Sequence, residues 1–189
     1  MTLAVLEGGS GRSGEVRLLA DAAQGSGPAV RRILDEAGPV LYGFVLGRVG
    51  GNDSTAEDLV QETLAEAMRS AHTFRGDAAL STWLCAIARR RLSRYYEKER
   101  KAGVARAGLT LVRDVPDSAE DDFDRADTVM RALGQLSADH RQVLVMKYLD
   151  ELPVAEIAAE MERTSVQIQS LLQRARESLR RQLEGVIDG

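Results

Sequence analysis

Apolar residues near the carboxyl end of the chain recur at helical spacing in three successive segments. After Ser137 one segment carries Val143, Leu144 and Tyr148. A second begins at Pro153 and holds apolar residues at positions i, i+3, i+4 and i+7, namely Val154, Ile157, Ala158 and Met161. A turn at 162–164 leads to a third apolar stripe, made of Ile168, Leu171, Leu172, Ala175 and Leu179. The pattern predicts three helices joined by short loops, and the last two form a helix-turn-helix.

The outward side of the last helix carries glutamine, serine and arginine. These side chains suit base edges and phosphates in a DNA major groove. The candidates for such contacts are Gln167, Gln169, Ser170, Gln173 and Arg174, with Arg176 and Arg180 further along. Periodicity alone leaves an ordinary solvated surface as the more frequent explanation, so the rest of the chain has to decide.

The amino-terminal half predicts a series of further helices. They cover residues 15–24, 28–37 and 39–49, with breaks at 25–27 and at Gly38-Pro39, and residues 1–14 are expected to be disordered. The next helix starts at Asp53 or Ser54, because Glu57 follows Ser54 at capping-box spacing. Its core positions are Val60, Leu64, Ala67, Met68 and Ala71, and its opposite side carries Glu57, Asp58, Gln61, Glu62 and Glu66.

A long helix is predicted over residues 80–101, after a loop at 72–79. One face is apolar and includes Leu80, Trp83, Leu84, Ile87 and Ala88. Four basic side chains fall within about 80° of the circumference: Arg90, Arg94, Lys98 and Lys101. Glu97 and Glu99 do not neutralise this stripe, so a basic face is expected.

Composition favours helix almost throughout. Aromatic residues make up 4% of the chain, prolines number four and hydrophobic residues reach 44%, which suits packed helical cores. We therefore expect an all-α protein of two small helical domains at 15–102 and 125–189, joined by an acidic linker at 103–124. Cys85 is expected to be a buried thiol. No apolar run reaches membrane-spanning length and no secretion signal is visible, which predicts a cytoplasmic protein without membrane insertion.

The net charge of −4 hides three charge blocks. Residues 89–106 hold eight basic and two acidic residues, a net charge of +6. Residues 107–130 hold two basic and seven acidic residues, a net charge of −5, and residues 163–181 carry +4. Two basic surfaces on either side of an acidic connector suit a protein that contacts DNA twice.

Several of these segments resemble a known family. The blocks DSTAEDLVQETL at 53–64, FRGDAALSTWLCAIAR at 74–89, and SADHRQVL, EIA and RARESLR between 137 and 180 resemble, in order and spacing, bacterial sigma factors of the extracytoplasmic-function (ECF) type in the sigma-70 family. The resemblance covers about residues 16–183. It implies a sigma region 2 helical bundle followed by a sigma region 4 helix-turn-helix.

The resemblance also implies roles for the first domain. The acidic helix would bind the clamp helices of the largest subunit of core RNA polymerase, through Glu57, Asp58, Gln61 and Glu62. The loop at 74–80 and the following helix would read the unpaired minus-ten element of promoter DNA, through Phe74, Arg75, Trp83, Arg89, Arg90, Arg94 and Lys98. For Trp83, core packing remains an equal alternative to base stacking.

For the second domain the resemblance implies reading of the minus-thirty-five element by Gln167, Gln169, Ser170, Gln173 and Arg174, and binding of the flap of the second-largest polymerase subunit. The linker would enter the active-site cleft, where its negative charge imitates RNA. An anti-sigma factor is an optional further partner. No catalytic residue, metal or cofactor is expected, so the chain is interpreted as a promoter-specificity subunit and not an enzyme.

Four positions depart from the family pattern. Arg90 stands where asparagine is common, so the base pocket is expected to differ. Glu162 stands where the helix-turn-helix usually has glycine, which predicts a strained left-handed residue or a reshaped turn. Gln169 and Leu171 replace residues that are usually basic, which predicts fewer phosphate contacts.

Two other function classes remain. A helix-turn-helix regulator acting without polymerase would not need the 53–64 and 74–89 blocks, which argue against it. A helical metalloenzyme using Glu57, Asp58, Glu62 and Glu66 would need Glu-x-x-His motifs. The residues three positions before His72 and His140 are Arg69 and Ser137, so neither histidine fits.

Overall fold

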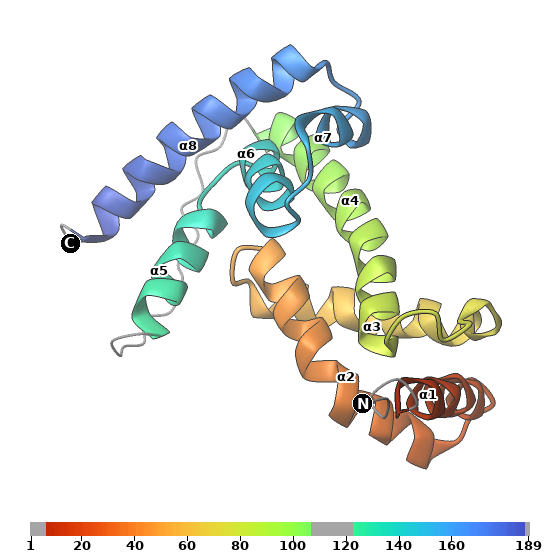
Figure 1. Cartoon of the computed structure of the whole chain (residues 1–189). Coiled ribbons are helices and arrows are strands. Elements are labelled where there is room, and N and C mark those ends of the chain that lie inside the picture. Colours follow the sequence, from red (N-terminus) through yellow and green to blue (C-terminus); the bar gives the residue numbers. More distant parts are fainter. Residues whose placement is uncertain (1–6, 107–122, 188–189) are drawn as a thin grey trace, which may run out of the picture. The chain divides into compact units, whose positions relative to one another are not determined.

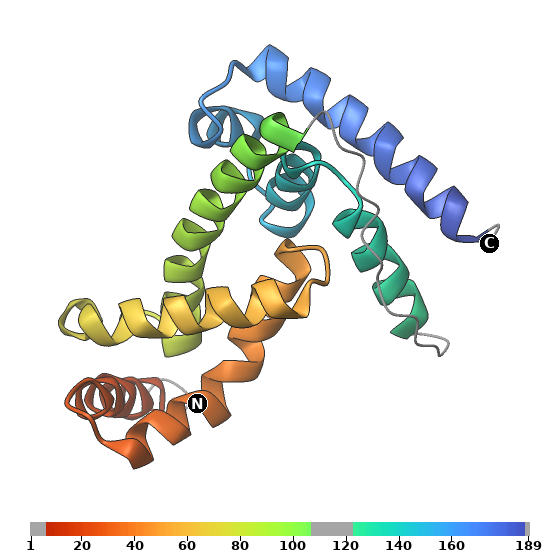
Figure 2. The ribbon, with the colours of Figure 1, turned by 180° about the vertical axis from the view of Figure 1, so that it is seen from behind.

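All regular secondary structure in the described residues is helical (Figures 1 and 2), which confirms the all-α fold class. The computed structural model describes residues 7–106 and 123–187. In chain order the elements are α1 (Glu7–Ala23), α2 (Gly27–Arg48), α3 (Asp53–Arg69), η1 (Ala71–Thr73), α4 (Leu80–Arg106), α5 (Phe123–Gly134), α6 (Ala138–Leu144), η2 (Val145–Leu149), α7 (Val154–Glu160) and α8 (Ser165–Ile187).

The chain forms two compact units. One holds residues up to 45 together with 53–92, and the other holds 46–52 together with the residues from 93 onward. The acidic linker predicted at 103–124 falls mostly outside the described residues, which resume at 123. Its first four residues, 103–106, continue α4, and its last two, 123–124, begin α5.

Helix α1 begins earlier than the sequence predicts. Residues 7–14 are helical, so the expected disordered tail is wrong for this stretch. Leu19 and Ala22 are buried, and the helix packs against α3 and η1. Once that packing has nucleated the helix, each further turn toward the amino terminus adds hydrogen bonds at little cost, and even a glycine-bearing segment can join it.

Helix α2 is continuous where two helices were predicted. The Gly38-Pro39 pair does not break it, and Pro39 lies inside the helix on an exposed side. Every fourth residue of this helix is buried, in the row Ala29, Ile33, Ala37, Leu41 and Val45. Each large side chain of the row contributes about 1.5–3 kcal/mol. Together they outweigh the roughly 3 kcal/mol that an interior proline costs.

Helix α3 buries a different face from the one predicted. Its buried residues are Ala56, Leu59, Thr63 and Ala67, whereas Val60, Leu64 and Met68 are half-buried. The hydroxyl of Thr63 donates to the carbonyl oxygen of Leu59 at 2.6 Å. This bond satisfies a polar group that would be costly to bury alone. Leu59 and three small residues therefore face the core, and Val60, Leu64 and Met68 lie at its edge.

The carboxy-terminal helices form a second core. Helix α8 packs against α5, α6 and α7, and Val143, Ile157, Ile168 and Ala175 are fully buried within this cluster. Ser137 caps α6, because its side chain accepts a hydrogen bond from the backbone N–H of His140. The apolar stripes predicted for 154–161 and 168–179 are those that meet here.

Tyr148 faces outward, contrary to the helical pattern expected for 143–148. Its exposed fraction is 55%, whereas Val145 and Met146 are buried. The cause is the π-helical turn η2, which follows α6 directly. A π turn holds more residues than an α turn. Residues beyond it are rotated away from the face that an α-helix would give them.

The turn between α7 and α8 contains a left-handed residue, as expected from Glu162. Glu162 has φ of 52°. Its N–H donates to the carbonyl oxygen of Ala159 at 3.3 Å, and the N–H of Arg163 donates to that of Ala158 at 2.9 Å. These two bonds form a Schellman motif, whose left-handed position favours glycine. Glu151, after η2, is also left-handed, with φ of 55°.

Glu162→Gly is expected to raise the free energy of unfolding by about 0.5–1 kcal/mol. Glycine removes the left-handed strain, although it also loosens the unfolded chain. Glu151→Gly should behave in the same way. Ala159→Gly, on the exposed side of α7, is the matched control and should lose about 1 kcal/mol. Urea unfolding of the three variants checks this, and a loss of stability in Glu162→Gly would contradict it.

Candidate nucleic-acid interface

An acidic surface covers the outward side of α3. Glu57, Asp58, Gln61 and Glu62 are all exposed and occupy positions i, i+1, i+4 and i+5, which form one continuous band on a helix. We call these four residues the acidic face. The buried residues of α3 lie on the other side, so the helix can present the acidic face without disturbing its packing.

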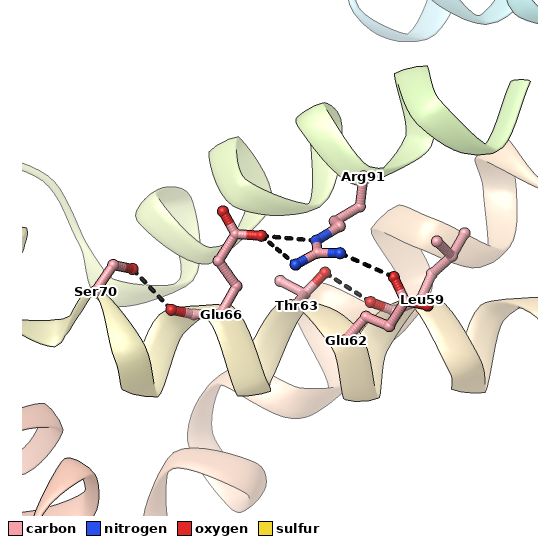
Figure 3. Close-up of polar contacts among 6 residues, drawn as sticks. All are labelled: Leu59, Glu62, Thr63, Glu66, Ser70 and Arg91. Carbon is pink, nitrogen blue, oxygen red and sulfur yellow. Dashed lines mark hydrogen bonds and ion pairs between the residues drawn. The ribbon is translucent and has the colours of Figure 1, made fainter. Parts of the chain in front are cut away.

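Arg91 of α4 reaches across to α3 (Figure 3). Its Nη1 lies 3.1 Å from Oε2 of Glu62, and its Nη2 lies 2.5 Å from Oε2 of Glu66. Arg91 was counted with the basic residues of 89–106, but the structure joins it to acidic side chains. The pairing holds Glu62 at the edge of the acidic face while its side chain remains 56% exposed.

The aromatic residues of the predicted single-strand reader pack together. Phe74 is 5% exposed, and its ring centroid lies 5.2 Å from that of Trp83 with the rings tilted by 47°. Such tilted pairs are favourable beyond the area they bury. Phe74 therefore serves packing in this structure. Trp83 is half-buried.

The basic residues predicted to follow a DNA backbone lie at the surface. Arg75 is exposed in the loop before α4, and Arg89, Arg90, Arg94 and Lys98 are exposed along that helix. The guanidinium carbon of Arg89 also lies 5.8 Å from the ring centroid of Phe44, a cation–π distance. The contact joins Arg89 of α4 to Phe44 of α2.

The far end of the basic stripe is partly neutralised, contrary to expectation. Lys101 Nζ lies 2.6 Å from Oε1 of Glu97. The hydrogen bond and charge of Lys101 lower the pKa of Glu97. The two residues are one helical turn apart, so the pair forms locally. The stripe available to a nucleic acid thus centres on Arg90, Arg94 and Lys98.

Helix α8 presents polar residues on the side away from its core. Gln169, Ser170, Gln173 and Arg174 are exposed, as predicted. Leu171 is only 3% exposed, so it packs in the core and does not stand at the edge of the stripe. At this position, where the family usually has a basic residue, this chain therefore has a core residue.

Gln167 is exposed, but its side chain is already engaged. Its Oε1 accepts a hydrogen bond from the backbone N–H of Thr164 at 2.8 Å, and its own N–H donates to Oγ1 of Thr164 at 3.2 Å. This reciprocal pair is a capping box. The Thr-x-x-Gln spacing in the sequence was the signal for it. Thr164 and Gln167 therefore cap the start of α8, and the side-chain N–H groups of Gln167 are left for other partners.

His140 is half-buried next to α8. Burial lowers its pKa below the ordinary value, and the charges of Arg174 and Arg181 lower it further, whereas Asp139 acts in the opposite direction. The neutral imidazole is the form that the fold favours. A group with a lowered folded pKa contributes stability above its unfolded pKa, which is near 6.5 for histidine, and loses it as the pH falls.

Between pH 7.5 and 5.5 the melting temperature should therefore fall more in the native chain than in His140→Gln. Glutamine keeps polarity and approximate size but does not become charged. The difference between the two pH profiles isolates His140 from the carboxylates, which titrate lower. Thermal melts monitored by circular dichroism check this, and parallel profiles would contradict it.

Among residues 7–106 and 123–187, no group of three or more His, Cys, Asp or Glu side chains is placed to hold a metal ion. No helix formed by those residues is both long and apolar enough to cross a membrane.

The sequence of this chain is similar to those of known proteins. Residues 33–102 match the family model of Sigma-70 region 2, and residues 126–179 match that of Sigma-70, region 4. The chain is 32% identical over 171 residues to the ECF RNA polymerase sigma factor SigL of Mycobacterium tuberculosis, covering 86% of this chain and 93% of that protein. It is 30% identical over 150 residues to the ECF RNA polymerase sigma factor SigW of Bacillus subtilis, with 72% and 79% covered.

A solved structure agrees with these matches. The sigma factor RpoE of Bartonella quintana, crystallised in complex with the anti-sigma factor NepR, aligns with a TM-score of 0.50 and 25% identity over 82% of this chain and 96% of that one. Both family regions thus occur in order on an all-helical chain, with relatives matched over most of their length. The chain belongs to the ECF RNA polymerase sigma factors of the sigma-70 family, which act in promoter-specific initiation of transcription and are not enzymes.

Proposed function

We propose that this chain binds core RNA polymerase through the acidic face of α3 and reads two promoter elements, the minus-ten element with α4 and the preceding loop, and the minus-thirty-five element with α8. The observation that carries the proposal is the division of α8 into a buried apolar side and an exposed polar side. It buries Ile168 and Leu171 and leaves Ser170, Gln173 and Arg174 exposed, which is how a recognition helix is presented to a major groove. A factor that works on polymerase and the chromosome acts in the cytoplasm.

Docking to polymerase is assigned to the acidic face because its charges are accessible and concentrated. Complementary charge speeds encounter and fixes register more than it adds raw affinity. Arg91 forms an ion pair with Glu62, but the Glu62 side chain remains 56% exposed. A basic group of the clamp helices can therefore contact the same carboxylate. The relative crystallised with an anti-sigma factor suggests that a protein of this kind is a further partner here.

Reading of the minus-ten element is assigned to the surface around Trp83 and Arg90. A single strand is held by stacking on aromatic rings and by cations along its backbone. Trp83 is only half-buried, and Arg90, Arg94 and Lys98 are exposed on the same helix. Arg90 comes one residue after the FRGDAALSTWLCAIAR block and stands where the family commonly has asparagine.

Arg90→Asn is expected to change which base is preferred in the minus-ten element. Lys98→Ala should instead weaken binding to all single strands alike and flatten the salt dependence, since it removes a phosphate contact. Holoenzyme binding to a panel of single-stranded oligonucleotides at several salt concentrations checks both. An equal, uniform loss in the two variants would show that Arg90 is a phosphate contact.

The whole proposal is tested by reconstitution. The chain is mixed with bacterial core RNA polymerase and genomic DNA, and the transcript starts are sequenced. We expect starts that depend on the chain and share sequence motifs at two fixed upstream distances. If the chain instead binds duplex DNA but neither associates with core in a pull-down nor changes the starts, it is a helix-turn-helix regulator acting without polymerase.

A further inference from the structure

Val166, on the first turn of α8, stands out as an exposed apolar side chain. Among the described residues it is the most exposed large hydrophobic side chain, at 74%. A β-branched residue at an exposed helix position adds no packing and lowers helix propensity slightly. Folding of the helix therefore does not account for a valine here, and a binding role is the alternative.

Val166 lies at the centre of the outward side of α8. Val166, Ser170 and Gln173 occupy positions i, i+4 and i+7, which form one row on a helix. The core residues Ile168 and Leu172 point to the other side. A surface depression includes Val166 together with Glu162, Arg163, Gln167, Ser170 and Arg174. The two methyl groups of Val166 are the apolar part of an otherwise polar and charged hollow.

Two of the side chains that line this hollow, Arg163 and Arg174, are cationic, and one, Glu162, is anionic. Arg174 is exposed on one side of it, and Arg181 is exposed two turns further along the helix. Both guanidinium groups suit the phosphates that border a groove. A protein partner that bound the exposed valine would have to accommodate these cations as well, so duplex DNA is the occupant that fits both features.

The capping box narrows what the first turn of α8 can recognise. A glutamine distinguishes adenine by accepting from its N6 amino group and donating to N7 at the same time. Oε1 of Gln167 is turned toward the backbone N–H of Thr164, so a bidentate contact with adenine would require Gln167 to give up this capping bond. Val166 is then the first-turn side chain best able to discriminate between bases.

We propose that Val166 reads one thymine of the duplex element bound by α8, through the C5 methyl group of the base. Thymine alone among the four DNA bases presents a methyl group in the major groove, and apolar side chains contact it there. The assignment rests on the proposed function of α8, and adds to it a residue and the base that this residue selects.

Deoxyuridine tests this proposal, because it differs from thymidine in that methyl group alone. Holoenzyme containing the full chain first selects duplexes from a library randomised in the upstream element. Each thymine of the selected site is then replaced singly by deoxyuridine. With the native chain, one replacement should weaken binding about threefold to fivefold, as expected for one buried methyl group. With Val166→Ala, the same replacement should have an effect of less than about 1.5-fold.

Val40→Ala is the matched control, since Val40 is also an exposed valine on a helix, at 54%. It should retain the native penalty for deoxyuridine. The proposal is overturned if no thymine shows a penalty, or if the penalty persists in Val166→Ala. The proposal is also overturned if Val166→Ala loses affinity for core polymerase while its penalty for deoxyuridine stays the same as in the native chain. Failure of the holoenzyme to select any upstream sequence would instead refute duplex reading by α8 itself.

Discussion

Lysine in place of both Asp58 and Glu62 is expected to weaken binding to core RNA polymerase about 100-fold or more. Each substitution removes an attraction and adds a repulsion to the basic partner surface, and like charges across an interface cost several kcal/mol. The fold should survive, because both side chains are exposed and the Glu62–Arg91 pair that is lost contributes under about 1 kcal/mol at an exposed site. Titration of labelled core with each variant measures the affinity.

Two controls separate docking from total charge and from the Arg91 contact. Asp21→Lys with Asp35→Lys changes the net charge by the same amount on exposed positions of α1 and α2, and it should leave core affinity within about threefold at physiological salt. Glu62→Gln breaks the ion pair with Arg91 without reversing charge, and it should have an intermediate effect. Unchanged affinity in the double reversal would remove the acidic face from the polymerase interface.

Leu171→Arg is expected to unfold the carboxy-terminal helices. Leu171 is 3% exposed and packs with Ile168 and Leu172 in the second core. Arginine there would bury an unpaired charge and overfill the site, which costs about 4 kcal/mol or more. Circular dichroism should show a lower melting transition and loss of helix, and the holoenzyme should lose affinity for duplex upstream DNA.

Gln169→Lys should act in the opposite direction on the same helix. Gln169 is exposed, so lysine adds a cation without disturbing the core. One added phosphate contact should tighten duplex binding severalfold and steepen the dependence of log affinity on log salt by about 0.9. Holoenzyme titrations at several salt concentrations measure this slope. No change in affinity or slope would show that this part of α8 does not face DNA.

The helical fold was predictable because it depends on local patterns repeated over many residues. The apolar stripes at 154–161 and 168–179 fit their helices closely enough to predict the second core. The capping box at Ser54 and Glu57 likewise predicted the start of α3 to within one residue. A left-handed residue at Glu162 was one of the two outcomes expected from the resemblance, because Glu162 stands where the helix-turn-helix usually has glycine.

Other features depended on neighbours distant in sequence. Pro39 should have ended a helix, but the buried row on α2 kept the helix continuous. The spacing of Tyr148 predicted a core residue, but the π turn rotates its side chain outward. Arg91 was grouped with the basic residues of 89–106, but it forms ion pairs with Glu62 and Glu66.

For function, the sequence by itself determined the family, the order of its two regions and the candidate side chains for contacts with polymerase and DNA. Residue types and their spacing suffice for that, because the chemistry of a carboxylate or guanidinium belongs to the residue. Only the tertiary structure decided which of them are available. Phe74 is buried against Trp83, and Arg91 is bound by Glu62 and Glu66 of the neighbouring helix. Burial and partnership are properties of the packed chain, set by which helix faces meet, and no local pattern contains them.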